Sequence, residues 1–147
     1  MSNAYSFQDV SASIVGPTGS ADLGYGAAVQ EEGIIFTQKS EVNTMTIGAD
    51  GKGMHSLHAD KSGRVTVKIL KTSPMNSILM AMFDAQRIAA SLWGQNVIVA
   101  RQTAAGDIVT ALDCAFCKPP DIKYAQVGDF LEWEWDTLEI DRILGTY

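Results

Sequence analysis

Two short motifs in the chain carry side chains that bind metals. Cys114 and Cys117 form a C-x-x-C motif, and His55 and His58 form an H-x-x-H motif. Two thiolates and two imidazoles are a common ligand set for structural zinc, so a small zinc-binding module is one interpretation of the chain. Both pairs, however, lie in segments with the pattern of β-strands, where residues three apart point to opposite faces. We therefore expect neither a zinc site nor a redox dithiol.

A row of carboxylates near the C-terminus is the second candidate for chemistry. Alternation along a strand places Glu132, Glu134 and Asp136 on one face and Trp133 and Trp135 on the other. Paired carboxylates can hydrolyse glycosidic bonds, but they then face each other across a cleft. An acidic face opposite two tryptophans is more typical of a strand with one covered and one solvated side. We expect a wet or lumenal acidic face and no enzymatic activity.

The glycine-rich loop from Gly48 to Gly53 is a candidate for phosphate or calcium binding. It lacks the Lys-Ser/Thr ending of a P-loop and the repeated Asp and Asn ligands of an EF-hand. Asp50-Gly51 is instead a strong signal for a tight hairpin turn, whose central residues must tolerate positive φ. We expect a turn here, and no metal or other cofactor in the protein.

The composition is that of a folded domain. Of the 147 residues, 46% are hydrophobic and 19% are charged, which suits one domain spanning residues 1–147. No apolar run approaches the ~20 residues that cross a bilayer, and the N-terminal sequence lacks the pattern of a signal peptide. We therefore expect no membrane contact and folding in a reducing cytoplasm.

The charge of the chain argues against tight binding of nucleic acid. Its 11 basic and 17 acidic side chains give a net charge of −6, and no basic patch stands out in the sequence. Acidic walls repel phosphates. The charge is therefore compatible with DNA as a passing cargo that slides without sticking.

Turn signals and alternating hydrophobicity predict a mainly β protein. The expected strands cover residues 5–15, 33–37, 42–47, 54–58, 64–70, 96–102, 108–116, 122–125 and 130–140, with a glycine-rich connection between the first two. Gln38 to Glu41 is the expected tip of one hairpin, and Asp60 to Gly63 is a second tight turn. Val65, Val67 and Ile69 share one face of their strand, so that strand should have one covered and one wet side.

One helix is expected after these first strands. Ser73 is a strong N-cap candidate, and Pro74 suits the first helical position. Gly94 provides a stop, so the helix should end near Trp93. Its apolar residues form a stripe wider than one core needs: Met75, Ile78, Leu79, Met80, Met82, Phe83, Ala85, Ala89 and Leu92. We expect the helix to cap an open end or face of a β-sandwich or barrel, with part of it covered by a second subunit.

Several short motifs occur in a specific order along the chain. G-A-D-G, D-x-S-G-x-V-T and L-x-T-S-P-x-N follow one another between residues 48 and 76. K-P-P-D at residues 118–121, E-W at residues 132–133, and then Asp136, Asp141 and Gly145 complete the series. In order and spacing, the stretch from about Phe36 to Gly145 resembles the tail tube proteins of contractile-tailed bacteriophages.

This resemblance implies a fold and a structural role in the virion. The fold would be two packed antiparallel sheets with one flanking helix, and six copies would form a ring whose inner sheets join into one β-barrel. Stacked rings would give a channel for genome ejection, with sheath, baseplate and tape-measure proteins as partners and DNA as transient cargo. Assembly would take place in the host bacterial cytoplasm. A secretion-tube protein of a contractile injection system, which shares the fold, is the nearest alternative.

The resemblance also implies that polar loops between strands contact the next ring. The two loops are Gln38 to Asn43 and Gly48 to Gly53, and the contact residues expected in them are Gln38, Lys39, Ser40, Glu41, Asp50 and Lys52. The channel lining is expected to be acidic, because the whole chain carries net negative charge.

Overall fold

The computed structural model describes residues 4–24, 26 and 29–146, which form ten strands, one α-helix and two short 3-10 helices. In chain order the elements are η1 (Phe7–Asp9), β1 (Val10–Gly16), β2 (Gly19–Asp22), β3 (Val29–Gln38), β4 (Asn43–Ile47), β5 (Gly53–Leu57), β6 (Gly63–Leu70), α1 (Met75–Gln86), η2 (Ala90–Leu92), β7 (Asn96–Gln102), β8 (Asp107–Phe116), β9 (Phe130–Thr137) and β10 (Glu139–Ile143). The expected glycine-rich connection contains the undescribed residues 25, 27 and 28, and its described part includes β2, which the sequence did not predict.

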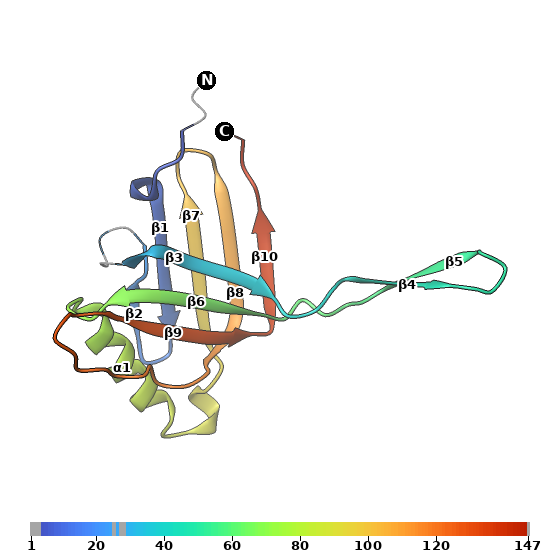
Figure 1. Cartoon of the computed structure of the whole chain (residues 1–147). Helices are drawn as coiled ribbons and strands as arrows, with labels where there is room; N and C mark the ends of the chain where they lie inside the picture. The colour runs from blue at the N-terminus through green and yellow to red at the C-terminus, as the bar shows by residue number, and fades with distance from the viewer. Residues whose placement is uncertain (1–3, 25, 27–28, 147) are drawn as a thin grey trace.

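Eight of the ten strands in the described residues form two antiparallel sheets that cross each other and share β8 (Figure 1). Sheet A has the spatial order β2-β1-β7-β8-β10, and sheet B has the order β3-β6-β9 and takes in the end of β8. This arrangement confirms the predicted fold class, which is mainly β with one helix and two packed antiparallel sheets.

Strand β8 belongs to both sheets because it bends near Asp113. Its first residues pair with β7 and β10, and its last two, Ala115 and Phe116, pair with Asp136 and Trp135 of β9. The pairing with β7 shifts register at the bend, as in a β-bulge, and Asp113 has a φ of 53°, in the left-handed region. A bulge bends its strand, and here it redirects the chain from sheet A into sheet B.

The expected single strand from Phe130 to Ile140 is interrupted at Leu138. Strand β9 pairs with β6 in sheet B, whereas β10 pairs with β8 in sheet A, so the chain changes sheets between them. The Thr137 hydroxyl donates a hydrogen bond of 2.6 Å to the Leu112 carbonyl and holds this corner. The expected short strand at residues 122–125 does not form, because this segment lies exposed outside both sheets.

Residues 29–70 form one long hairpin with two separate paired regions (Figure 1). Near the body β3 pairs with β6, and farther out β4 and β5 pair with each other in a two-stranded sheet of their own. The predicted hairpin tip at Gln38–Glu41 and the predicted turn at Asp60–Gly63 are therefore wrong. Both segments run side by side as the neck between the two paired regions, and the chain reverses only at Gly48–Gly53.

Hydrogen bonds across the neck explain its polar residues, which resemble turn residues in the sequence. Ser40 Oγ donates to a carboxylate oxygen of Asp60 over 2.7 Å, and the Lys39 backbone N–H donates to the Ser62 carbonyl over 3.1 Å. Hydrogen bonds from Ser62 and Ser40 lower the pKa of Asp60 to about 2. We call residues 39–62 the arm, because they project from the body of the protein (Figure 1).

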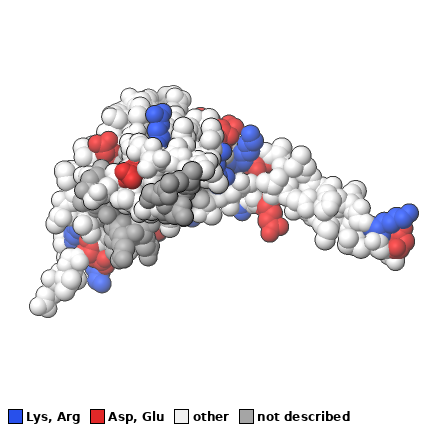
Figure 2. Space-filling model, turned by 90° about the horizontal axis from the view of Figure 1, so that it is seen from above, with Lys and Arg blue, Asp and Glu red and all other residues white. Residues whose placement is uncertain are grey.

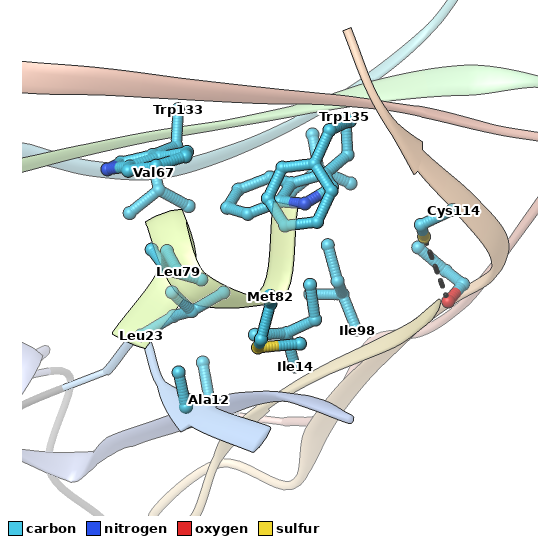
Figure 3. Packing of buried hydrophobic residues seen from close by; sticks show 14 of the residues in the cluster. Ala12, Ile14, Leu23, Val67, Leu79, Met82, Ile98, Cys114, Trp133 and Trp135 are labelled. Atoms are coloured by element: carbon cyan, nitrogen blue, oxygen red, sulfur yellow. Dashed lines mark hydrogen bonds between the residues drawn. The ribbon is translucent and has the colours of Figure 1, made fainter. Parts of the chain in front are cut away.

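The core lies between the two sheets and α1 (Figure 3). Trp133 and Trp135 stack with ring centroids 6.5 Å apart, and Phe116 packs against both at 6.0 and 5.4 Å. Phe83 of α1 meets Phe116 edge-on at 5.6 Å. The expected alternation holds in β6 and β9, where the buried residues are Val65, Val67, Ile69, Trp133 and Trp135.

Helix α1 ends at Gln86, seven residues before the predicted end at Trp93. Trp93 packs edge-on against Phe83 with ring centroids 6.0 Å apart. In a continuous helix these residues would lie about 15 Å apart along the axis, so the contact requires the chain to turn back. Within the expected apolar stripe, Leu79, Met82 and Phe83 are buried as predicted, but Ile78 is exposed and the side chain of Gln86 is buried instead.

Two buried amides fix the end of the helix to sheet A. Gln86 and Asn96, both fully buried, exchange hydrogen bonds of 2.7 and 2.9 Å. Asn96 also donates to the Cys114 carbonyl at 3.0 Å, and Gln86 donates to the Thr18 hydroxyl at 3.2 Å. Polar groups at these positions can be buried only because each has a partner.

Replacing Asn96 with alanine is expected to lower the free energy of unfolding by about 1–3 kcal/mol, since the Gln86 amide and the Cys114 carbonyl would lose buried partners. Urea unfolding followed by tryptophan fluorescence measures the change. Gln95→Ala is the matched control, because Gln95 is exposed and should cost less than about 0.5 kcal/mol. Equal urea midpoints for the two variants would contradict this account of the helix end.

Candidate assembly surfaces

The tip of the arm is a closed turn held by backbone and side-chain hydrogen bonds. The Gly48 N–H donates to the Lys52 carbonyl over 2.7 Å, and the Asp50 carboxylate accepts the Lys52 N–H over 3.2 Å. Gly51 has a φ of 84°, which suits glycine. The Asp50 carboxylate thus closes the turn, and both charged residues of the tip, Asp50 and Lys52, are exposed.

The rest of the arm exposes apolar side chains to solvent. The register of β4 and β5 places Met45, Ile47 and Leu57 on one face and Met54 on the other. Their exposed fractions are between 55% and 84%. Between neck and tip the arm surface is nearly free of charge (Figure 2). Projecting apolar surface of this kind marks an interaction site in soluble proteins.

The predicted contact residues Gln38, Lys39, Ser40 and Glu41 lie at the neck, where the arm meets the body. Lys39 points back to the body, and its Nζ is 2.9 Å from the Asp136 carboxylate of β9. Ser40 is bonded across the neck, as described above. Lys39 and Ser40 therefore stabilise the base of the arm, in contrast to Asp50 and Lys52, which lie at its tip.

The outer face of sheet B carries acidic and basic residues in register. Cross-strand pairing places Arg64 of β6 opposite Asp136 of β9, and places Lys68 opposite Glu132. Arg64 Nη2 is 3.3 Å from Asp136, and Arg64 Nη1 is 3.7 Å from Glu134. The three acids of the predicted acidic face thus lie on the outer face of sheet B, where basic side chains from a distant part of the sequence lie beside them.

The ion pairs on this face act on the protonation of Asp136. Burial would raise the pKa of its carboxyl group, but hydrogen bonds from Lys39 and Cys117 and the charges of Lys39 and Arg64 outweigh that burial and hold the pKa below its usual value. Asp136 therefore stays ionised at neutral pH and keeps its two basic partners.

The structure does not bring the two candidate metal-binding motifs together. His55 and His58 lie on the arm, hydrogen-bonded to Asn43 and Thr44, whereas Cys114 is buried in the core. Burial raises the pKa of both Cys114 and Cys117 to about 11, which disfavours the thiolate that zinc needs. Within residues 4–24, 26 and 29–146, no three His, Cys, Asp or Glu side chains form a group that could hold a metal ion.

Helix α1 begins one residue later than the sequence predicts, with Pro74 at the N-cap position and Ser73 just before it. The helix begins at Met75, and the Ser73 hydroxyl accepts the Met75 N–H over 3.3 Å. Pro74 lies between them with helical φ and ψ. Asn76, which the sequence did not single out by its chemistry, donates to the Leu70 carbonyl at 2.9 Å and accepts from the indole N–H of Trp133 at 3.0 Å. This asparagine joins the helix, β6 and β9.

Sheet B has two edges at which another chain could pair. Strand β3 ends the order of strands, and β9 pairs with β8 through only two described residues. Unpaired edges of this kind expose backbone donors and acceptors that pair readily with another strand.

In the described part of the chain, no helix has the length and apolar character to span a bilayer.

Comparison with known proteins identifies the family. The model of the bacteriophage PhiTE tail tube protein family matches residues 1–145. The chain belongs to this tail tube family. The family match covers all of the residues described above as arm, charged face and sheet edges, and it confirms the resemblance found in the sequence.

Solved structures support the same fold for this tail tube family member. The anti-feeding prophage baseplate has a TM-score of 0.60 at 12% identity, covering 97% of each chain. The anti-feeding prophage tube-terminating cap gives 0.57 at 6% identity, covering 99% of this chain and 95% of the other. The extended sheath-tube complex of the PVC extracellular contractile injection system gives 0.54 at 7% identity, covering 90% and 88%. These likenesses concern the fold alone.

Family membership makes the tail tube protein a structural component of the phage virion. Proteins with curated descriptions provide no sequence match. The zinc-module interpretation has no support from the family match. The surfaces that sequence reasoning missed are the apolar arm and the basic residues on the face of sheet B. The basic residues could be placed beside the acids of β9 only once the pairing of β6 with β9 was known.

Proposed function

We propose that the protein forms the inner tail tube of a contractile phage tail, in which six copies close into a ring and rings stack around a channel for genome ejection. The observation that carries this proposal is the arm, which exposes apolar residues far from the body in a member of the tail tube family. A chain that contacts its neighbours head to tail builds a filament. The arm supplies such a contact, with Asp50 and Lys52 reaching the next ring.

Sheet B is the better candidate for the inner wall. Its outer face carries Arg64, Lys68 and the three acids of β9, which suits a water-filled channel. The outer face of sheet A carries apolar residues between its buried positions, among them Val15, Val97, Val99 and Leu112. Such a surface suits a protein partner. The edges at β3 and β9 would then join neighbouring copies into one β-barrel.

The remaining parts of the proposal concern partners and location. The sheath protein would surround the tube on its sheet A side, and the baseplate and tape-measure proteins would meet its ends. The chain would act as one domain without catalytic activity, and tubes would assemble in the host cytoplasm. DNA would be a transient cargo only.

The secretion-tube alternative has the same fold, and one of the similar solved structures is named as an extracellular contractile injection system. The family match names a phage tail tube and covers residues 1–145. We therefore prefer the phage tail. Sheath, baseplate and capsid genes together beside this gene would support a phage, whereas a neighbourhood without capsid genes would support the alternative.

Negative-stain microscopy and sedimentation velocity of concentrated purified protein test the assembly. We expect rings or tubes, together with a species much larger than the monomer that grows with concentration. Protein that sediments only as a monomer at every concentration, both alone and with isolated phage baseplates as template, would contradict the proposal.

A further inference from the structure

The outer face of sheet B carries two basic side chains of β6 beside three acidic ones of β9. Alternation along β6 brings Arg64 and Lys68 to this face, and alternation along β9 brings Glu132, Glu134 and Asp136 there. The antiparallel register sets the rows directly opposite each other. Cross-strand pairs of opposite charge are the arrangement that a sheet face stabilises.

The ion pairs on this face link β9 to β6 and to the neck of the arm. Arg64 contacts both Asp136 and Glu134, at 3.3 and 3.7 Å. Lys39 reaches from the neck of the arm to the same Asp136 carboxylate at 2.9 Å. One carboxylate therefore holds two cations that lie 25 positions apart in the sequence. Arg64, Lys39 and Asp136 each keep 44% of the side chain exposed, so the pairs face solvent.

The acidic residues of β9 also border the neighbouring surface. A groove of about 270 Å³ lies beside them, lined by Glu132 and Glu134 and by Lys118 and Lys123. Basic residues from one further segment, the connection between β8 and β9, thus border the same acids. Figure 2 shows basic and acidic residues side by side where the arm leaves the body.

We infer that the β9 carboxylates mask a latent phosphate-binding surface, so that a nucleic acid passing this face slides along it and is not held. Arg and Lys on an exposed face bind phosphates when they are free, and this binding releases counterions. Here the carboxylates of β9 compete with phosphates for the same basic side chains. The result is a charged surface on which Arg64 and Lys39 are paired with carboxylates and are not available to bind phosphates. The biological meaning of the mask rests on the proposed tube, in which this face lines the channel.

The test is binding of a short fluorescent DNA duplex to the unassembled protein, followed by anisotropy at several salt concentrations. The variant Glu132→Gln/Glu134→Gln/Asp136→Asn keeps the shape of the side chains and removes their charge. We expect it to bind on the order of tenfold more tightly than the unmodified protein at low salt. Its plot of log K against log salt should be steeper by about 2, because each neutralised phosphate adds ~0.9 to the slope.

The control variant Asp22→Asn/Glu41→Gln/Asp84→Asn changes the net charge by the same amount at exposed acids elsewhere. It should leave binding nearly unchanged. Adding Arg64→Gln and Lys68→Gln to the first variant should abolish the gain. Asp136→Asn alone, which removes the carboxylate shared by Lys39 and Arg64 and leaves Arg64 with Glu134, is a milder second variant and should show part of the gain.

Two results would overturn the mask. One is equal binding by the first variant and the charge-matched control, since net charge alone would then explain the effect. The other is tight binding by the unmodified protein. Neither result depends on ring formation, so failure of the mask and failure of the proposed tube are distinguished by this assay and by microscopy respectively.

Discussion

A variant with Met45→Asp and Ile47→Asp is expected to form no tubes under conditions in which the unmodified protein does. Both side chains lie on the same face of β4 and are 60% and 55% exposed. Burying one such side chain at an interface contributes about 1.5–3 kcal/mol, and a carboxylate there has no partner to offset its desolvation. The loss is repeated at every subunit, so assembly should fail completely. Sedimentation and microscopy measure it.

The fold of this variant should survive, because the arm side chains that change are already in solvent. We expect circular dichroism and the urea midpoint to change by less than about 0.5 kcal/mol. The matched control is Thr44→Asp/Thr46→Asp, which places the same two charges on the other face of the same strand. Tubes from the first variant, or loss of tubes from both, would contradict a role for the Met45 and Ile47 face.

Trp133→Ala is expected to lower the free energy of unfolding by about 3–5 kcal/mol, which is a large part of the stability of a domain of this size. Trp133 is 1% exposed, stacks on Trp135, and donates its indole N–H to Asn76 at 3.0 Å. Its loss leaves a cavity between α1 and sheet B and removes the hydrogen bond that the Asn76 side-chain oxygen accepts from it. Urea unfolding followed by circular dichroism measures the effect.

The two tryptophans allow a sharper comparison of their indole groups. Trp135 Nε1 is buried without a hydrogen-bond partner in the described part of the chain, whereas Trp133 Nε1 has one. Trp133→Phe should therefore cost about 1–2 kcal/mol more than Trp135→Phe, because only the former leaves a buried acceptor on Asn76 unpaired. Equal losses of unfolding free energy in the two variants would show that the hydrogen bond of Trp133 contributes no stability beyond the packing of the ring.

The parts of the fold that follow local rules could be predicted from the sequence. Alternation placed Val65, Val67 and Ile69 inside and Arg64 outside, and the Asp50-Gly51 pair placed the reversal of the arm at residues 48–53. In these segments a residue's neighbours in sequence are also its neighbours in the structure, so local patterns suffice.

Two of the errors involve contacts between segments that are separated in the sequence. The neck of the arm resembles a turn because Ser40 and Asp60 are polar, but they bond to each other across 20 positions. The early end of α1 depends on Asn96, which lies on β7 and accepts the Gln86 amide. The hydrophobic pattern within the helix therefore could not predict where the helix ends.

The candidate assembly surfaces were predictable to a similar extent. The acids of β9 and the loops of the arm could be singled out by composition, but their roles could not be separated. Lys39 belongs with Asp136 and not with the tip, because β3 and β6 pair and bring the neck to the edge of sheet B. The sequence shows that Met45, Ile47 and Leu57 are apolar. Only the projection of the arm away from the body shows that these side chains do not pack into the hydrophobic core.

A cryo-EM reconstruction of the assembled tube tests the central claim most directly. The account predicts rings in which β3 of one copy lies beside β9 of the next, with Arg64, Lys68, Glu132, Glu134 and Asp136 facing the channel and the arm in contact with another ring. A channel lined by the outer face of sheet A, or an arm that touches no other subunit, would contradict it.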